Sequence, residues 1–272
     1  MTFEDFARIH GLIINHVIPY KEVRTSTQEH PHKKNGSYKF LGDKGFVMNW
    51  ATMDKPATWF PDKNTPITIK KISQVEANKE RKELAEQAKK KAEWIMGQVN
   101  QDTHPYLAAK GFPNMQGYVW NKNGEKLLVI PMRSYSSLVG LQLIDAQGNK
   151  KFLYGQSSKG AVFTFNAKGF PIFCEGYATA LSVREVLLKT SNIKYSIYTC
   201  FSASNMKFIA RKFRKGIIIA DNDRNGIGEK TAIEANKPYW IASTIGYDFN
   251  DYHMEVGTEK ASQELKKLIQ TI

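Results

Sequence analysis

The chain has 272 residues, an apolar share of 42% and a formal net charge of +13. This length accommodates two modest domains or one large one, and the charge favours a polyanionic partner such as nucleic acid, because lysines and arginines near phosphates release counterions. With only Cys174 and Cys200 present, a four-cysteine zinc site and a disulfide framework are excluded, and we expect both residues to be buried thiols.

Residues 1–68 predict a small β-containing module, because short aromatic pieces such as GSYKF and GFVMNW alternate with turns. The opening stretch MTFEDFARIHGLIINHVIPY lacks the basic start, apolar middle and cleavage site of an export signal. No run approaches 18 uncharged apolar residues, the length that a membrane-spanning helix needs. We therefore expect a cytoplasmic protein with no membrane partner.

A long basic helix is predicted over residues 69–101, which are rich in the strong helix formers Ala, Glu, Lys, Gln and Leu. The apolar positions leave only a narrow stripe, with lysines over much of the remaining surface. This pattern favours a solvated linker helix over a helix that binds template. The stripe consists of Ile72, Val75, Leu84, Ala88, Ala92 and Ile95.

Residues 102–168 predict an antiparallel β subdomain, since strand-like runs alternate with turns such as NKNGEK and DAQGNK. The predicted strands are 126–131, 138–145, 151–153 and 161–165. From residue 169 to 272 apolar runs alternate with helix-like segments, which is typical of a parallel sheet flanked by helices. The fold class is thus α/β in this last domain and α+β overall.

Acidic residues follow two strands of the predicted parallel sheet. PIFCE ends in Glu175, and GIIIAD ends in Asp221, with Asp223 two positions later. Carboxyl ends of parallel strands meet at one edge of a sheet, and residues two apart in extended chain point the same way, so these carboxylates can share one cleft. Two helices and one strand lie between Glu175 and Asp221, a length that suits neighbouring strands.

Clustered carboxylates repel one another unless a hard cation lies between them, and Mg²⁺ prefers such oxygen ligands. The pattern therefore points to phosphoryl transfer or phosphodiester chemistry. The alternative from the residues alone is that these acids cap the helices that follow. The stretch GIGEKT at 226–231 is no P-loop, because Glu229 separates the glycine from the lysine, and Gly226 and Gly228 are expected to serve the turn into the next helix.

The stretches FCEGYATALSV and IIIADNDRNGIGEKTA resemble the two signature motifs of Toprim domains, the catalytic fold of bacterial primases, topoisomerases and some nucleases. HPYLAAKGF, LLVIPMRSYSSLVGLQLIDAQGNKKFLYGQSSKGAVF and GYDFND are similar to primases of plasmids and phages, which are related to the catalytic core of bacterial replicative primase. KKNGSYKF and NWATMDKPATWF are similar to the N-terminal region of those primases. The resemblance covers nearly the whole chain.

This resemblance implies that Glu175, Asp221 and Asp223 are catalytic and hold Mg²⁺ or Mn²⁺. It implies further that Asp248 and Asp251 support a second ion. The basic positions that match those engaging nucleoside triphosphate and template are Arg133, Lys151 and Lys159.

Two departures from the family pattern stand out. Bacterial replicative primases carry an aspartate four residues after the first glutamate, whereas this chain has Thr179 there, as in the plasmid and phage branch. The zinc ribbon of many primases is missing, so no zinc is expected, and the N-terminal module either reads template without zinc or does not read it at all.

The expected function is therefore that of a DNA primase, which makes short RNA primers on single-stranded DNA from nucleoside triphosphates. A helicase supplied by another chain is a further possible partner. A Toprim nuclease is one alternative; a topoisomerase is not, because the chain has no room for the domain that carries its tyrosine nucleophile. The other alternative is an inactive protein that coats single-stranded DNA through aromatic residues such as Trp50, Trp59 and Trp120.

Overall fold

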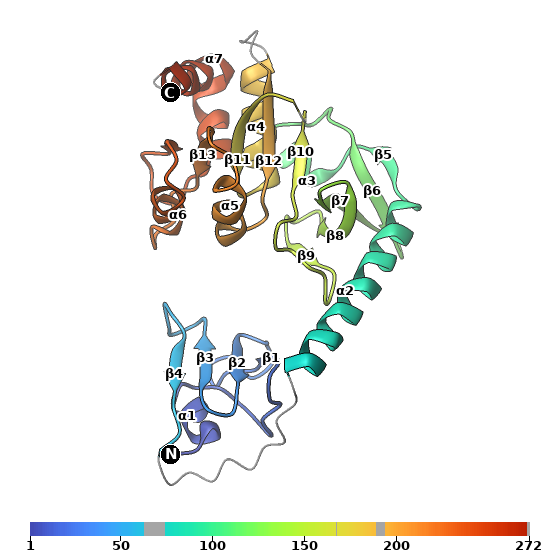
Figure 1. The fold of residues 1–272 in the computed structure, drawn as a ribbon. Coiled ribbons are helices and arrows are strands. Elements are labelled where there is room, and N and C mark those ends of the chain that lie inside the picture. Colours follow the sequence, from blue (N-terminus) through green and yellow to red (C-terminus); the bar gives the residue numbers. More distant parts are fainter. Residues whose placement is uncertain (63–73, 167, 189–193, 271–272) are drawn as a thin grey trace. The chain divides into compact units, whose positions relative to one another are not determined.

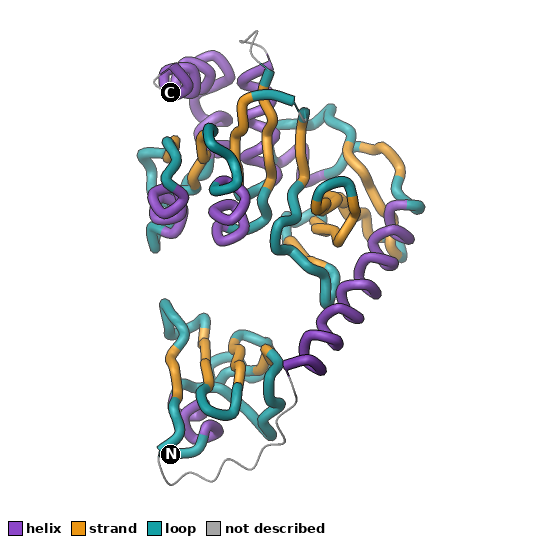
Figure 2. Tube along the Cα trace, viewed as in Figure 1, coloured by secondary structure: helices purple, strands orange, loops and turns teal. Residues whose placement is uncertain are grey.

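The computed structural model describes residues 1–62, 74–166, 168–188 and 194–270 (Figure 1). The chain divides into two compact units, Met1–Glu83 and Leu84–Ile272, and each is described by itself. The fold is mixed α/β, with helices and three separate sheets (Figure 2). Within the described residues, no helix combines the length and the apolar character that crossing a membrane requires.

Up to residue 62 the first unit contains an antiparallel sheet and a short helix, and its remaining described residues, 74–83, begin a long helix. The short helix begins after Thr2, whose side chain accepts a hydrogen bond from the Asp5 amide. The predicted strands are confirmed, while the helix was not predicted, because its two turns offer too short an apolar period. The sheet has the order β1-β2-β3-β4. The elements are α1 (Phe3–Ile9), β1 (Glu22–Thr25), β2 (Gly36–Phe40), β3 (Gly45–Asn49) and β4 (Ala57–Trp59).

The long helix α2 spans Gln74–Met96 and ends directly before Gly97, so it is shorter at its C-terminal end than predicted. Residues 69–73 of the prediction lie outside the described residues. In the second half of the helix the side chains of the predicted apolar stripe are buried against the second sheet, so the helix is packed on this face, while most of its other residues stay exposed. Those side chains are Ala88, Ala92 and Ile95.

The second sheet is antiparallel, as predicted, with the order β5-β6-β7-β8-β9. Alternate side chains of its long strand β7 separate two cores: Leu127 and Val129 pack with α2, whereas Leu128 and Ile130 pack with α3 and α4. The elements are β5 (Asn100–Asp102), α3 (Pro105–Ala109), β6 (Gly117–Lys122), β7 (Glu125–Ser134), β8 (Ser137–Ile144) and β9 (Lys150–Phe152).

The third sheet has the order β10-β12-β11-β13-β14, and its strands β11 to β14 are parallel, as predicted. The strand predicted at 161–165 is shorter, and it pairs antiparallel with β12 at the edge of this sheet rather than extending the second one. The strands are β10 (Phe163–Phe165), β11 (Phe170–Cys174), β12 (Tyr195–Thr199), β13 (Ile217–Ala220) and β14 (Tyr239–Ile241).

Helices cover both faces of the parallel sheet. Ile172 of β11 lies in a core with α4 and α7, whereas the next residue, Phe173, lies in a core with α5 and α6. Both predicted thiols, Cys174 and Cys200, are buried. The helices are α4 (Tyr177–Leu188), α5 (Ala203–Ala210), α6 (Ile227–Ala235) and α7 (Phe249–Gln270), with a non-helical residue at Gly257 inside α7.

Candidate active site

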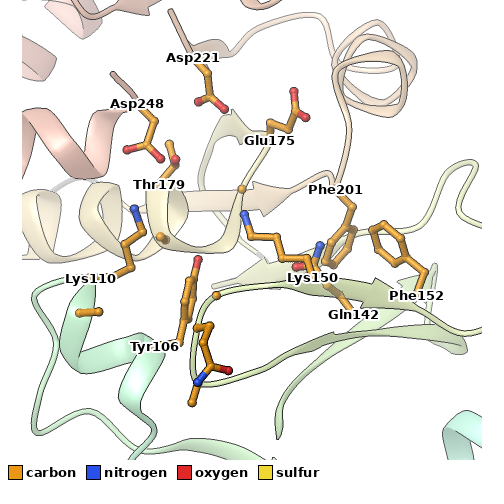
Figure 3. Close-up of a pocket in the computed structure, with 16 residues that line it drawn as sticks. Tyr106, Lys110, Gln142, Lys150, Phe152, Glu175, Thr179, Phe201, Asp221 and Asp248 are labelled. Atoms are coloured by element: carbon orange, nitrogen blue, oxygen red, sulfur yellow. The ribbon is translucent and has the colours of Figure 1, made fainter. Parts of the chain in front are cut away.

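A cleft of about 510 Å³ lies between the antiparallel sheet with α3 and the carboxyl edge of the parallel sheet (Figure 3). Every residue that lines it belongs to the unit Leu84–Ile272. The lining side chains bring acids, lysines and aromatic rings together. The residues are Tyr106, Ala109, Lys110, Gln142, Ala146, Gln147, Gly148, Lys150, Phe152, Glu175, Gly176, Ala178, Thr179, Phe201, Asp221 and Asp248.

Two of the predicted acids, Glu175 and Asp221, face this cleft from neighbouring strands. β11 and β13 pair in parallel with Cys174 opposite Ile219, so the chain reaches Glu175 and Asp221 at the same edge. Close packing supports this edge: a Cβ added at Gly228 would lie 2.1 Å from the carbonyl oxygen of Asp221. Gly228 is the second residue of α6, so its missing side chain lets this helix approach the backbone of Asp221, whereas Gly226, with a φ of 65°, forms the turn before the helix, as predicted.

Burial makes both carboxylates hard to ionise. Burial, followed by the charges of Asp248, Glu175 and Asp223, raises the pKa of Asp221 to about 7, and Lys150 opposes this shift. Burial and the charge of Asp223 also raise the pKa of Glu175. The Oδ1 atom of Asp221 is buried without a hydrogen-bond partner. A positive charge bound at this edge of the sheet would therefore stabilise the ionised form of both carboxylates.

Asp223 is exposed and does not line the cleft, although its charge reaches both Glu175 and Asp221. Strand β13 ends at Ala220, so both aspartates follow the strand rather than lying within it. A turn that begins at Asp223 is closed by a hydrogen bond from the Gly226 amide to the Asp223 carbonyl oxygen. The prediction that Asp223 is a metal ligand stays a prediction.

Asp248 lines the cleft, whereas Asp251 does not. The Asp251 amide donates to Oδ1 of Asp248 at 2.9 Å, and the Asp248 amide donates to Oδ2 of Asp251 at 3.1 Å. This reciprocal pair is a capping box at the start of α7. Asp251 also forms an ion pair with Lys110 at 3.6 Å. The structure thus gives Asp251 a structural role, and its predicted part in holding an ion remains a prediction.

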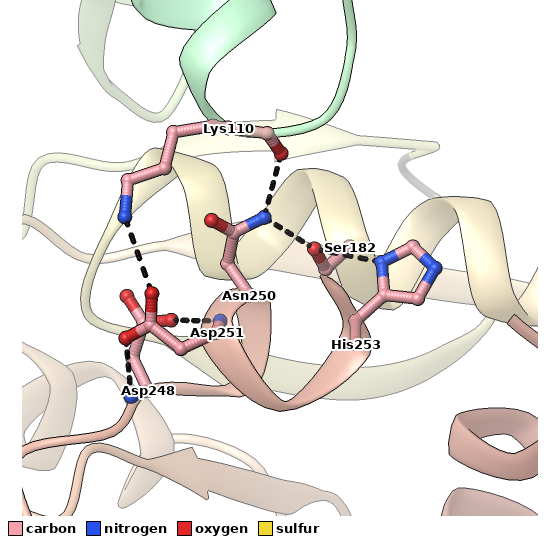
Figure 4. Close-up of polar contacts among 6 residues, drawn as sticks. All are labelled: Lys110, Ser182, Asp248, Asn250, Asp251 and His253. Carbon is pink, nitrogen blue, oxygen red and sulfur yellow. Dashed lines mark hydrogen bonds and ion pairs between the residues drawn. The ribbon is translucent and has the colours of Figure 1, made fainter. Parts of the chain in front are cut away.

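A buried amide connects the two sides of the cleft (Figure 4). The Asn250 side chain donates to the Lys110 carbonyl oxygen and to Ser182 Oγ, each at 2.9 Å. Ser182 Oγ also lies 3.1 Å from His253 Nδ1. These bonds hold the end of α3, the middle of α4 and the start of α7 together, so the position of Lys110 relative to Asp248 is fixed.

Lys110 and Lys150 extend into the cleft toward the carboxylates (Figure 3). All three residues of β9 are exposed, but only Lys150 and Phe152, which lie on one face of the strand, line the cleft, and Lys151 between them does not. Sequence reasoning selected Lys151 and missed both lining lysines. A single run of two lysines does not reveal which of them faces inward, because that depends on the register with β8.

The other two predicted basic residues lie elsewhere. Arg133 is exposed at a bulge in β7 and donates to the Ser136 carbonyl oxygen at 3.0 Å. The Lys159 ammonium group lies over the ring of Phe208, 5.0 Å from its centre. Neither residue lines the cleft, and neither binding role is tested by this arrangement.

The chemistry of the cleft fits a divalent cation. Carboxylate oxygens are hard donors, and among the described residues that line the cleft three buried side-chain oxygens have no hydrogen-bond partner: Asp221 Oδ1, Thr179 Oγ1 and Tyr106 Oη. In the part of the chain that the structure describes, no three His, Cys, Asp or Glu side chains form a ready-made cage. The donor set therefore suits Mg²⁺ or Mn²⁺, with coordination completed on binding.

No family model matches the chain. Part of the chain is similar to two structures from bacteriophage T7. One is the primase fragment of the primase-helicase protein, at 19% identity and a TM-score of 0.45, covering 63% of this chain and 77% of that one. The other is a lagging-strand DNA polymerase complex with primase domains of two gp4 subunits bound to an RNA/DNA hybrid and dTTP. There the identity is 17%, the TM-score 0.44 and the coverage 63% of this chain and 92% of that one.

Proposed function

We propose that the protein is a DNA primase of the Toprim type, which makes short RNA primers on single-stranded DNA by metal-dependent nucleotidyl transfer. The observation that carries the proposal is the cleft itself. Carboxylates from the ends of β11 and β13 and the start of α7 face two lysines, and a buried oxygen of Asp221 lacks a partner. The motifs around Glu175 and Asp221, which resemble those of Toprim domains, support the same function.

Glu175, Asp221 and Asp248 would hold Mg²⁺ or Mn²⁺, with Asp223 close enough to add its charge. The bound ion supplies charge neutralisation at the reacting phosphate and lowers the pKa of the attacking hydroxyl. Asp221 would lose its proton on binding a cation, because its raised pKa reflects burial beside other carboxylates. No zinc is required by this arrangement.

Lys110 and Lys150 would bind the triphosphate of the incoming nucleotide, since both ammonium groups point into the cleft. Charge-assisted hydrogen bonds to phosphate oxygens are stronger than neutral ones and hold the chain of phosphates in line for transfer. Buried Tyr106 stays neutral, because burial and the charge of Asp248 raise its pKa, and its hydroxyl can donate to a bound phosphate. Single-stranded DNA and nucleoside triphosphates are the proposed partners, with a helicase supplied by another chain.

The test is primer synthesis on single-stranded DNA with labelled nucleotides and Mg²⁺. Asp221→Asn is expected to reduce synthesis about 100-fold or more, because it removes a ligand charge while keeping the shape of the side chain. Asp223→Asn is expected to reduce synthesis as well, because the charge of Asp223 acts on both Glu175 and Asp221. Glu125→Gln is the matched control, since this exposed acid lies at the opposite end of β7 from Arg133 and lines no part of the cleft.

Circular dichroism must show that both asparagine variants keep the fold. Primer synthesis at the wild-type rate by either variant would contradict its assignment as a catalytic residue. Shortening of the DNA without added nucleotides would instead support the nuclease, whereas metal-independent DNA binding with no product would support the inactive binding protein.

A further inference from the structure

A nucleotide has a flat base as well as phosphates, and the cleft offers a second kind of surface for it. Three aromatic side chains line the cleft: Tyr106, Phe152 and Phe201. Tyr106 and Phe201 are buried, whereas Phe152 remains 46% exposed. A ligand that stacks on the exposed ring of Phe152 would bury apolar surface, and this burial favours binding.

The ring of Phe152 is held in place by its neighbours. It lies on the same face of β9 as Lys150, which extends toward the carboxylates (Figure 3). Phe201, at the end of β12, meets it edge to face, with ring centres 6.4 Å apart and planes at 84°. Such a T-shaped contact fixes the orientation of the ring without covering all of it.

A polar side chain lies directly beside the ring. β8 and β9 pair with Gln142 opposite Phe152, so both side chains project from one face of the sheet into the cleft. The amide of Gln142 offers both a donor and an acceptor, which is what the edge of a nucleobase requires.

We propose that Phe152 and Gln142 form the nucleobase subsite of the cleft, with the base stacked on Phe152 and its edge against the amide of Gln142. The ligand class is a nucleoside triphosphate. Its phosphates lie toward Lys150 and the carboxylates, and its base lies toward Phe152. The inference rests on the proposed function only in that the cleft binds nucleotides.

The test compares ATP with inorganic tripolyphosphate, which carries the phosphates without a base. Isothermal titration in the presence of Mg²⁺ measures the dissociation constant of each. Phe152→Leu is expected to weaken ATP binding about 5- to 50-fold, because stacking on the ring is lost, and to leave tripolyphosphate binding within about twofold. Phe152→Trp is expected to retain or strengthen ATP binding.

Gln142→Met keeps the length of the side chain and removes its polar atoms, so it is expected to weaken ATP binding about 3- to 10-fold with tripolyphosphate again unchanged. Phe60→Leu is the matched control, since Phe60 is an exposed aromatic residue outside the cleft. Equal weakening of ATP and tripolyphosphate by Phe152→Leu, unchanged ATP binding, or no ATP binding by the wild-type protein would overturn the subsite.

The binding measurement separates this inference from the proposed function. Selective loss of ATP binding in Phe152→Leu supports the subsite even when the wild-type protein makes no primer. Primer synthesis that is unaffected in both KM and kcat by Phe152→Leu contradicts the subsite while leaving the primase proposal intact.

Discussion

The two sheets of the Leu84–Ile272 unit bring opposite charges to the same cleft. The parallel sheet contributes carboxylates through residues that follow its strands, Glu175 after β11 and Asp221 after β13. The antiparallel sheet contributes Lys150, Phe152 and Gln142 through residues inside its strands. In the parallel sheet, a residue reaches the cleft when it directly follows the carboxyl end of a strand. In the antiparallel sheet, a residue reaches the cleft when its side chain lies on the face of the strand that is turned toward the cleft.

Gly228→Ala is expected to have the largest effect, because it displaces one of the carboxylates that line the cleft. The added methyl group would lie 2.1 Å from the Asp221 carbonyl oxygen, so the backbone that carries this carboxylate has to move. We expect a loss of about 3 kcal/mol in the free energy of unfolding and a fall of about 100-fold in primer synthesis. Urea denaturation and the labelled-nucleotide assay measure the two effects.

Gly97→Ala is the control for this change, since a methyl group there meets nothing closer than 3.4 Å. Its effect on the free energy of unfolding is expected to stay within about 0.5 kcal/mol. Primer synthesis at the wild-type rate by Gly228→Ala would show that displacement of Asp221 does not impair the site.

A comparison of Lys150→Met with Lys151→Met tests whether the face of β9 on which a lysine lies determines its part in the cleft. Lys150 lines the cleft and Lys151 does not, so removal of the first charge is expected to raise the KM for ATP about tenfold and removal of the second less than about twofold. Steady-state primer synthesis measures both values. The reverse order would favour Lys151, the residue that the family resemblance implies, over the residue that the geometry selects.

Asp221 gives the metal-free protein a pH dependence of stability. Its pKa is about 7 in the folded protein, above the ordinary value of 3.8, so the folded state binds the proton more tightly than the unfolded state. This contribution to stability is fully present below about pH 4 and is lost as the pH rises through 7.

The measurement is the free energy of unfolding in EDTA for wild type and Asp221→Asn at pH 5 and pH 8. The advantage of the variant is expected to grow by about 2 to 3 kcal/mol between these values. An advantage that is equal at both values would show that Asp221 ionises normally in the folded protein.

Asp251→Ala is expected to have the smallest effect. It removes one half of the capping box of α7 and the ion pair with Lys110, for a loss of about 1 kcal/mol in the free energy of unfolding. Glu259→Ala, at an exposed position farther along α7, serves as the control in thermal denaturation. A loss of primer synthesis as large as that of Asp221→Asn would place Asp251 among the ion's ligands instead.

Much of the parallel sheet was predictable because its strands are continuous apolar runs between helix-like segments. Neighbouring strand ends then followed from the length of chain between Glu175 and Asp221. The hairpins of the antiparallel sheet were predictable from their turns. Short elements such as α3 were not, because five residues offer too little periodicity to identify a helix.

The basic side of the cleft was less predictable for a different reason. Whether Lys150 or Lys151 points inward depends on the pairing of β9 with β8, and one residue of slip exchanges them. The position of Lys110 depends on a contact with α7 that no local pattern encodes.

That contact has a consequence for the width of the cleft. Asn250 spans the space between the Lys110 carbonyl oxygen and Ser182, 140 and 68 positions away along the chain. The length of the Asn250 side chain thereby sets the distance between Lys110 and the carboxylates on the other side of the cleft. A glutamine here, longer by one methylene, would push the end of α3 away from α7, and the distance across the cleft between Lys110 and Asp248 would increase with it.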